Sequence, residues 1–255
     1  MNLSHISSRS SVGKALRLPL RLVPRSLPVP VLQGKLRGKW WIAGASNHGC
    51  WLGSYEYDKR RLFEKIVSPG SIVFDVGANV GFYTMLASVL VGKGGSVYAF
   101  EPVPRNLHFL KRHMQMNRLK NVTVVEAAVS DYGGKAAFDV GAGPAVGRLE
   151  THGQLEVEVV NLDGLIKNGK VPPPDFIKLD IEGGEGAALR GARSTLAQSH
   201  PTIFLATHGP GVHRECCEFL QSMGYELQPI CGQSLADTDE VLATREGHAP
   251  PGLGS

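Results

Sequence analysis

The sequence predicts an α/β protein in which helices cover both faces of a doubly wound, mostly parallel sheet. From Ser71 onward, short runs rich in β-branched residues alternate with amphipathic helical segments, the pattern of parallel strands joined by crossover helices. A glycine-rich turn directly follows the first of these runs. The 255 residues, 42% of them hydrophobic and 20% charged, are enough for one large core with an extension.

The expected main strands are short and lie at residues 72–76, 96–100, 122–127, 176–180 and 202–206. The segments between them carry apolar residues three to four positions apart, as at Leu107, Leu110 and Met114, which is typical of amphipathic helices. Residues 135–140 and 155–160 predict a two-stranded insertion before the fourth main strand.

The composition divides the chain into four parts. Residues 1–33 are rich in Ser, Arg and Pro and predict a disordered basic extension. Residues 34–70 hold an aromatic cluster and a helical pattern, so we expect a bridge that packs on the core. Residues 71–245 form the main α/β domain, and residues 246–255 predict a flexible tail.

Charge and cysteine content limit the partners and the compartment. The first 55 residues contain eight Lys or Arg and no Asp or Glu. A solvated tail is the simpler interpretation, and weak contact with an anionic surface or a transit peptide are the alternatives. No run of about eighteen apolar residues predicts a membrane-spanning helix. The four cysteines lack CxxC spacing, which favours a reducing compartment and a cytoplasmic location.

Three motifs follow the predicted strands, at the edge of the sheet where open α/β proteins bind ligands. The first is DVGANVG, in which Gly77 and Gly81 allow a tight turn and Asp75 stands at its mouth. The spacing is not GxGxxG. A pyrophosphate prefers bare amides at a helix N-terminus, whereas a carboxylate there suits a cationic ligand such as an amino-acid-bearing sulfonium.

The second motif is Glu101-Pro102, twenty residues after Gly81 and at the end of the next strand. An acid at that position can accept hydrogen bonds from the two hydroxyls of a ribose. The third is KLDIEGG, which places Asp180 and Glu182 together at the end of the fourth strand. Two neighbouring carboxylates carry a cost of desolvation and repulsion, and this favours a functional role over a structural one.

Taken in order, DVGANVGFYT, AFEP, AAVSD, NLDGL, IKLDIEGGE and LRGA resemble the FkbM-type methyltransferase family over roughly residues 70–208. The resemblance implies a class I methyltransferase fold, that is, a Rossmann-like, seven-stranded, mostly parallel sheet. It also implies S-adenosylmethionine as cofactor and O-methylation of a hydroxyl on a sugar, glycan or secondary metabolite. Residues 71–245 would then be the methyltransferase domain.

The resemblance also assigns roles to single positions. It implies that the methionine end of the cofactor lies against the first motif and that Glu101 holds the ribose. The segment after the third strand would flank the adenine, and Asp180 and Glu182 would face the methyl group and the acceptor. The full expected cofactor-binding set is Asp75, Gly77, Asn79, Gly81, Glu101, Pro102, Ala128, Val129 and Asp131. One departure is Ala206, where such proteins often carry an acid two residues before the histidine.

Methyl transfer to a hydroxyl needs a base that removes the acceptor's proton. His208 follows a predicted strand and has an ordinary pKa near pH 7, so we expect it to be the base, with Asp180 as the alternative. We expect no metal, although Asp180, Glu182 and His208 together could also bind a divalent cation. The expected catalytic set is therefore His208, Asp180 and Glu182.

Other functions remain open at this level. A nicotinamide-dependent oxidoreductase shares the fold, but the missing GxGxxG counts against it. A non-catalytic module that binds S-adenosylmethionine is compatible with the first two motifs. Enzymes that methylate nucleic-acid bases usually carry a Pro-Pro-aromatic run after the fourth strand, where this chain has DIEGG. We therefore expect a small-molecule or glycan acceptor and no nucleic-acid partner; oligomeric state is open.

Overall fold

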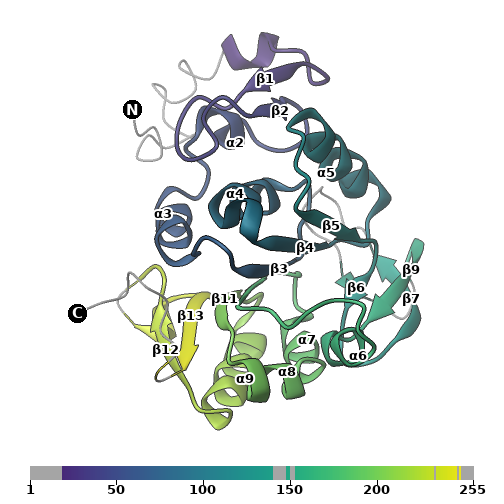
Figure 1. Ribbon diagram of the computed structural model, residues 1–255, viewed down its shortest axis with the longest axis vertical. Helices are drawn as coiled ribbons and strands as arrows, with labels where there is room; N and C mark the ends of the chain where they lie inside the picture. Colours follow the sequence, from purple (N-terminus) through teal and green to yellow (C-terminus); the bar gives the residue numbers. More distant parts are fainter. Residues whose placement is uncertain (1–18, 140–147, 150–152, 233, 246, 248–255) are drawn as a thin grey trace.

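The computed structural model describes residues 19–139, 148–149, 153–232, 234–245 and 247 (Figure 1). Its centre is a seven-stranded sheet in the order β12-β13-β11-β10-β3-β4-β5. The strands are β3 (Ile72–Val76), β4 (Ser96–Phe100), β5 (Val122–Val125), β10 (Phe176–Leu179), β11 (Thr202–Ala206), β12 (Tyr225–Pro229) and β13 (Glu240–Arg245). In this sheet β13 runs antiparallel to both of its neighbours, β11 and β12, and the other neighbouring strands pair in parallel. The predicted doubly wound α/β fold is confirmed.

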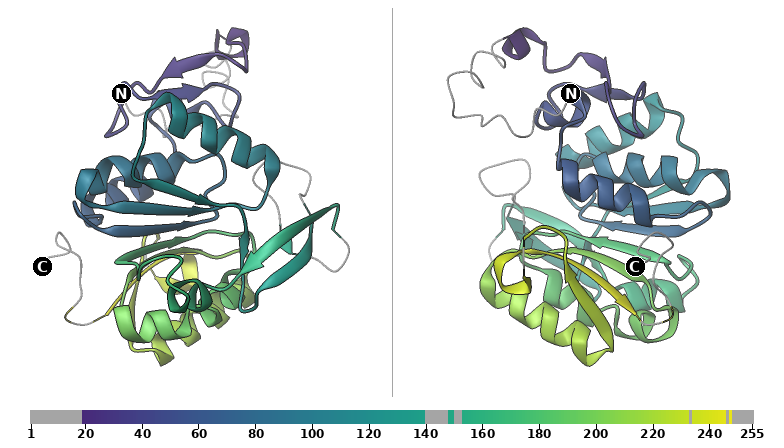
Figure 2. Two further views of the ribbon diagram at one scale, coloured as in Figure 1. Left: turned by 45° about the vertical axis from the view of Figure 1, so that its right-hand side comes forward. Right: turned by 90° about the vertical axis from the view of Figure 1, so that its left-hand side faces the viewer.

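Helices cover both faces of this sheet (Figures 1 and 2). One face packs against α3 (Tyr57–Ile66), α4 (Phe82–Val91) and α5 (Pro104–Met116), and the other against α6 (Leu162–Lys167), α7 (Glu185–Arg190), α8 (Arg193–Ser199) and α9 (Pro210–Ser222). Strand alternation separates the two cores, because Val73 joins the first and Phe74 the second. Both side chains are fully buried, and each contributes on the order of 1.5–3 kcal/mol.

The N-terminal segment forms a cap on the first core. It contains η1 (Pro19–Leu22), the antiparallel pair β1 (Pro28–Pro30) and β2 (Trp40–Ile42), and α2 (Gly49–Leu52). Trp41 is completely buried, and its ring stacks on His113 of α5 with centroids 4.0 Å apart. Nε2 of His113 accepts a hydrogen bond from the Ile42 amide at 3.0 Å. The cap is therefore fixed to α5 by both packing and hydrogen bonding.

A smaller sheet lies beside the main one, in the order β6 (Ala128–Val129), β9 (Leu155–Val160), β7 (Gly134–Asp139) and β8 (Arg148–Leu149). The antiparallel pair of β7 and β9 matches the predicted insertion closely. Residues 140–147 and 150–152, between β7 and β9 of this insertion, lie outside the described residues. So do residues 1–18 and all but residue 247 of the expected C-terminal tail, residues 246–255. In the described chain, no helix is long and apolar enough to cross a membrane.

Candidate active site

A cleft of about 1360 Å³ opens at the carboxyl ends of β3, β4, β10 and β11. Its floor comes from the loops that follow these strands, and part of its wall comes from the N-terminal cap through Arg25, Ser46, Asn47 and Cys50. Single small-molecule sites usually measure about 300–1,000 Å³. The cleft therefore has room for two ligands side by side.

The loop after β3 needs its glycines because neighbouring parts of the protein pack closely against them. Gly77 has φ +82°, and a Cβ placed on it would lie 1.9 Å from the backbone oxygen of Asp180. A Cβ on Gly81, with φ +93°, would lie 2.6 Å from a methyl group of Leu110. These glycines let the β3 loop approach the β10 loop and α5. Gly77 lines the cleft, whereas Gly81 does not.

Asp75 lies beneath the cleft floor and does not line it. Its side chain is 1% exposed and faces α4, where the hydroxyl of Thr84 donates to Oδ2 at 2.5 Å. Nζ of Lys178, from β10, lies 3.5 Å from Oδ1. Asp75 thus acts on a ligand only through Lys178, which does line the cleft. This differs from the expected direct contact, because alternation along β3 turns the side chain toward the helix.

Glu101 reaches the cleft from the end of β4. It is 4% exposed and accepts hydrogen bonds from the backbone amides of Asn79 and Val103 and from the Asn106 side chain. Burial raises its pKa above the ordinary value, although these three donors oppose the shift. An ionised carboxylate offers about four acceptor positions, so one remains for a ligand hydroxyl.

The other expected cofactor residues divide into two groups. Asn79, Pro102, Ala128 and Val129 line the cleft. Asn79 has a left-handed backbone, with φ +50°, that points its amide at Glu101. Asp131 lies outside the cleft lining and pairs with the Arg190 guanidinium at 3.2 Å on the surface. This ion pair joins the β6 loop to α7.

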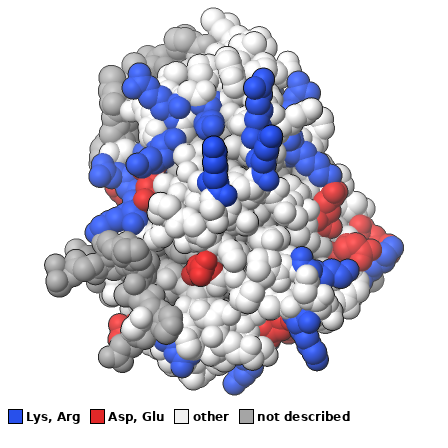
Figure 3. All heavy atoms as spheres, viewed as in Figure 1, with Lys and Arg blue, Asp and Glu red and all other residues white. Residues whose placement is uncertain are grey.

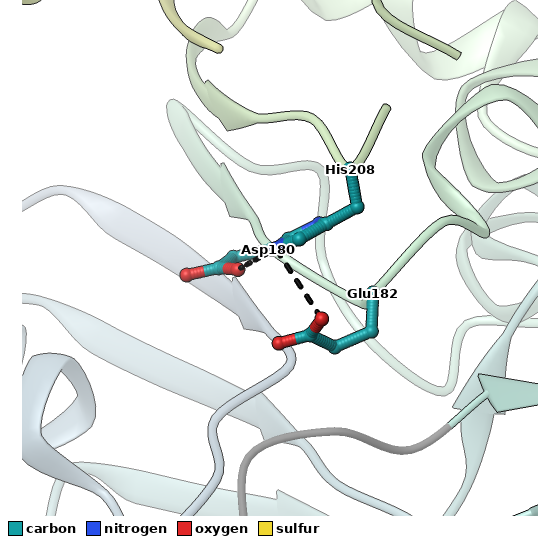
Figure 4. A group of neighbouring side chains, drawn as sticks. All are labelled: Asp180, Glu182 and His208. Carbon is teal, nitrogen blue, oxygen red and sulfur yellow. Dashed lines mark ion pairs between the residues drawn. The ribbon is translucent and has the colours of Figure 1, made fainter. Parts of the chain in front are cut away.

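Asp180, Glu182 and His208 meet at the opposite side of the cleft (Figure 4). Nε2 of His208 lies 3.8 Å from Oδ1 of Asp180 and 3.5 Å from Oε2 of Glu182. Each residue offers one ligand atom, and the three atoms lie within 4.8 Å of one another. Glu182 has φ +58°, a left-handed conformation that is strained for a residue with a Cβ. In this conformation its carboxylate lies beside Nε2 of His208.

Sequence reasoning missed the residue that orients His208. Glu185, in the first turn of α7, is completely buried and accepts a hydrogen bond from Nδ1 of His208 at 2.8 Å. The same oxygen also accepts from the amides of Ile181 and Gly183. Because a carboxylate cannot donate, the proton of neutral His208 sits on Nδ1 and the lone pair of Nε2 faces the cleft.

The ionisation of the group follows from its surroundings. The hydrogen bond from His208 to Glu185 raises the pKa of His208 above its ordinary value, and the nearby carboxylates add to this. Burial disfavours ionisation of Asp180, but Lys178, Lys59 and His208 outweigh it and lower its pKa. Burial raises the pKa of Glu182. His208 is therefore a stronger base than Asp180.

Two lysine side chains, both about 5% exposed, neutralise Asp180 at Oδ2, the oxygen other than the one that faces His208. Nζ of Lys178 lies 3.4 Å and Nζ of Lys59 4.0 Å from Oδ2. Lys59 also lies 2.7 Å from Glu240 of β13 and 3.5 Å from Glu56, so α3 is tied to the sheet at the edge of the cleft. These ammonium groups already balance much of the negative charge that would otherwise attract a cation.

Comparison with known proteins decides the family. The protein-family model described as the methyltransferase FkbM domain matches residues 75–227, which are more than half of the chain. The chain belongs to the FkbM methyltransferase family. S-adenosylmethionine is the methyl donor of this family, and the expected family and class I methyltransferase fold are confirmed.

The similar proteins are distant in sequence. The hexuronic acid methyltransferase AglP of Haloferax volcanii is 27% identical over 155 residues, which are 60% of this chain and 62% of AglP. The 31-O-demethyl-FK506 methyltransferase FkbM of Streptomyces tacrolimicus is 28% identical over 215 residues, covering 71% of this chain and 79% of that protein. The crystal structure of methyltransferase FkbM from Methylobacillus flagellatus has a TM-score of 0.50 at 19% identity, over 78% of this chain and 55% of that one.

The residues of this FkbM-family cleft fit S-adenosylmethionine. The ligand carries a positive sulfonium, a ribose diol and an aromatic base. The cleft offers carboxylates at Asp180 and Glu182, a buried acceptor at Glu101, and an apolar surface at Ala128 and Val129. Buried Glu101, which keeps one acceptor position free at the cleft wall, matches one of the two ribose hydroxyls, fewer than the two that its position in the sequence predicts.

Proposed function

We propose that the protein methylates a hydroxyl group on a sugar, glycan or secondary metabolite, with S-adenosylmethionine as methyl donor. The observation that supports this most strongly is the pair of His208 and Glu185, an imidazole at the cleft wall held by a buried carboxylate at 2.8 Å. When bound, S-adenosylmethionine supplies an electrophilic methyl group. The protein's own part is to hold the acceptor in line with that methyl group and to accept its proton.

His208 accepts the proton on Nε2 as the acceptor oxygen attacks. The imidazolium that forms is stabilised by Glu185 on the opposite side of the ring and by Asp180 and Glu182 at 3.8 and 3.5 Å. Asp180 is a weaker base because its pKa is lowered by two lysines and His208. Its place near His208 suits it to stabilise positive charge.

Two relatives support an oxygen acceptor. The name of AglP states a hexuronic acid as its substrate, and that of FkbM states an acceptor that lacks an O-methyl group. Because the chain matches only 62% of the length of AglP, we infer the class of acceptor and not the sugar itself. A hydroxyl acceptor also agrees with the need for a base at His208, since a free hydroxyl loses its proton only with assistance.

Methyl transfer is tested with radiolabelled S-adenosylmethionine and a panel of uronic acids, neutral glycosides and polyketide alcohols. We expect label on one hydroxyl class, a loss of turnover of about 10²–10⁴-fold in His208→Asn, and unchanged binding of S-adenosylhomocysteine. His200→Asn is the matched control, because it changes a histidine that does not line the cleft. Tight binding without turnover on every acceptor would favour a non-catalytic binding module, and preference for NAD would favour an oxidoreductase.

We further infer a reducing compartment, with the cytoplasm as the proposed location. All four cysteines are free in the structure, and Cys50 and Cys216 are buried. Proteins of oxidising compartments usually pair such residues. Cell fractionation with a compartment marker tests this, and recovery of an oxidised, disulfide-linked form from cells would contradict it.

A further inference from the structure

Two arginines of the cleft wall form no ion pair with any acidic residue that the structure describes. The lysines of the cleft lining, Lys59 and Lys178, are bound to carboxylates of the site itself. Arg25 of the N-terminal cap and Arg105 of α5 also line the cleft, and both are exposed. Their positive charge is therefore available to a ligand of opposite charge.

Both arginines contact one turn of the cap. The Gly44 amide donates to the backbone oxygen of Arg25 at 2.8 Å, and Nη2 of Arg105 donates to the backbone oxygen of Ala45 at 3.2 Å. A Cβ placed on Gly44 would lie 2.4 Å from the Cβ of Arg25, so the stem of Arg25 packs against the same turn. The two arginines thus belong to one region of the cleft wall.

The guanidinium group of Arg105 is held in place. It lies over the ring of Phe109, 5.1 Å from the ring centre, and its Nη1 donates to Oδ1 of Asn106 at 3.1 Å. Asn106 in turn donates to Glu101 at 3.3 Å, which places Arg105 beside the expected ribose site. The two hydrogen bonds of Arg105 leave about three of the five guanidinium N–H donors for a ligand. A guanidinium presents these donors in a planar fork that matches carboxylate and phosphate groups.

The surface around this region is basic. The chain has no acidic residue before Glu56. Figure 3 shows Lys and Arg side chains gathered over the cap and α5. Exposed basic residues of these elements and of the chain directly after α5 are Lys35, Arg37, Lys111, Arg112, Arg118 and Lys120. Charge of one sign around a cleft raises the local concentration of ligands of the opposite sign.

We propose that Arg25 and Arg105 bind an oxyanion group, a carboxylate or a phosphate, on the methyl acceptor. The inference rests on the proposed function, because it takes the second ligand of the cleft to be that acceptor. S-adenosylmethionine carries a sulfonium and an ammonium group beside its one carboxylate, so it matches two guanidinium groups poorly. Its sulfonium suits Asp180 and Glu182 on the opposite side of the cleft. The acceptor is then an anionic sugar or glycan, with its hydroxyl at His208.

The test is isothermal titration of the protein saturated with S-adenosylhomocysteine. The probes are methyl glucuronoside, methyl glucoside and the phosphate ester of methyl glucoside, which differ only at one carbon. We expect both charged sugars to bind at least about tenfold more tightly than the neutral one, and the tighter of the two identifies the anionic group. Arg25→Gln is expected to weaken binding of the charged sugars about fivefold to tenfold and to leave the neutral one unchanged. Arg112→Gln is the matched control, because it removes an exposed arginine of α5 that does not line the cleft.

A second variant separates the shape of the guanidinium from its charge. Arg105→Lys keeps the positive charge but loses the planar fork, so we expect about threefold weaker binding of the charged sugars, with the fold checked by a melting curve. Equal binding of charged and neutral sugars, no binding of any of the three, or native affinity in Arg25→Gln would each overturn the proposal. Weaker binding of S-adenosylhomocysteine by Arg25→Gln would assign this arginine to the methyl donor and also overturn it. None of these readouts depends on methyl transfer, so failure here leaves the proposed function unaffected.

Discussion

Replacing Glu185 with Gln tests the role of the buried carboxylate that orients His208. The charged acceptor at 2.8 Å from Nδ1 becomes a neutral one, while an amide oxygen can still accept from the Ile181 and Gly183 amides. A hydrogen bond to a charged group contributes about 1.5–3 kcal/mol, which corresponds to roughly one to two pKa units. Because Asp180 and Glu182 still raise the pKa of His208, we expect a fall of about one unit.

The assay is the pH profile of kcat/KM. A base must be neutral to act, so activity rises with pH through the pKa of His208, which in the native enzyme lies above 6.5. In Glu185→Gln this rise moves to lower pH by about one unit, and the plateau falls about 10- to 100-fold because the imidazole is a weaker and less fixed base. Glu218→Gln, an exposed change of equal charge on α9, leaves the profile in place. A Glu185→Gln profile that coincides with the native one, or rises at higher pH, would refute the assignment.

Three further measurements address the rest of the molecule. Glu101→Gln should weaken binding of S-adenosylhomocysteine about 10- to 100-fold, whereas Glu126→Gln at an exposed site should not; equal affinities would remove Glu101 from the site. Burial lowers the pKa of His113 to about 4, so below pH 6.5 the unfolded chain binds more protons. Because of this group, the free energy of unfolding measured with urea should be about 3 kcal/mol lower at pH 4 than at pH 7. In His113→Gln this part of the pH dependence of stability should disappear. EDTA should leave turnover unchanged, because Lys178 and Lys59 already neutralise Asp180, and a loss that Mn²⁺ restores would contradict this.

The fold could be predicted because its central strands carry strong local signals. The runs at 72–76, 96–100 and 202–206 match β3, β4 and β11 to the residue, since apolar β-branched stretches buried on both faces leave little ambiguity. The sequence does not place the strands β12 and β13 individually. The edge strand β12 alternates polar and apolar residues, as in Tyr225–Pro229, and that pattern is a weaker signal. The strand β13 carries only a short apolar run, residues 241–243, between polar residues.

The sequence predicts which residues lie at the strand ends, and therefore which residues lie near the site, but it does not predict where their side chains point. Strand ends located Glu101, Asp180 and His208 at one edge of the sheet, and the structure brings them around one cleft. The direction of a side chain is a different matter. Asp75 turns away from the cleft, and Glu185, in the first turn of α7, turns into the protein. The only signal for Glu185 was its place in the IEGGE motif.

The cleft is assembled from two parts of the chain that the family match separates. The floor belongs to residues 75–227, which match the family model, whereas Arg25, Ser46, Asn47 and Cys50 of the wall precede that segment. The cap carries its own buried anchor, Trp41 on His113. Exchange of residues 19–67 therefore replaces one wall of the cleft, together with Lys59 beside Asp180, and leaves the strand-end loops in place. Chimaeras cut at the β3 boundary would take this wall from one parent and the loops after β3, β4, β10 and β11 from the other.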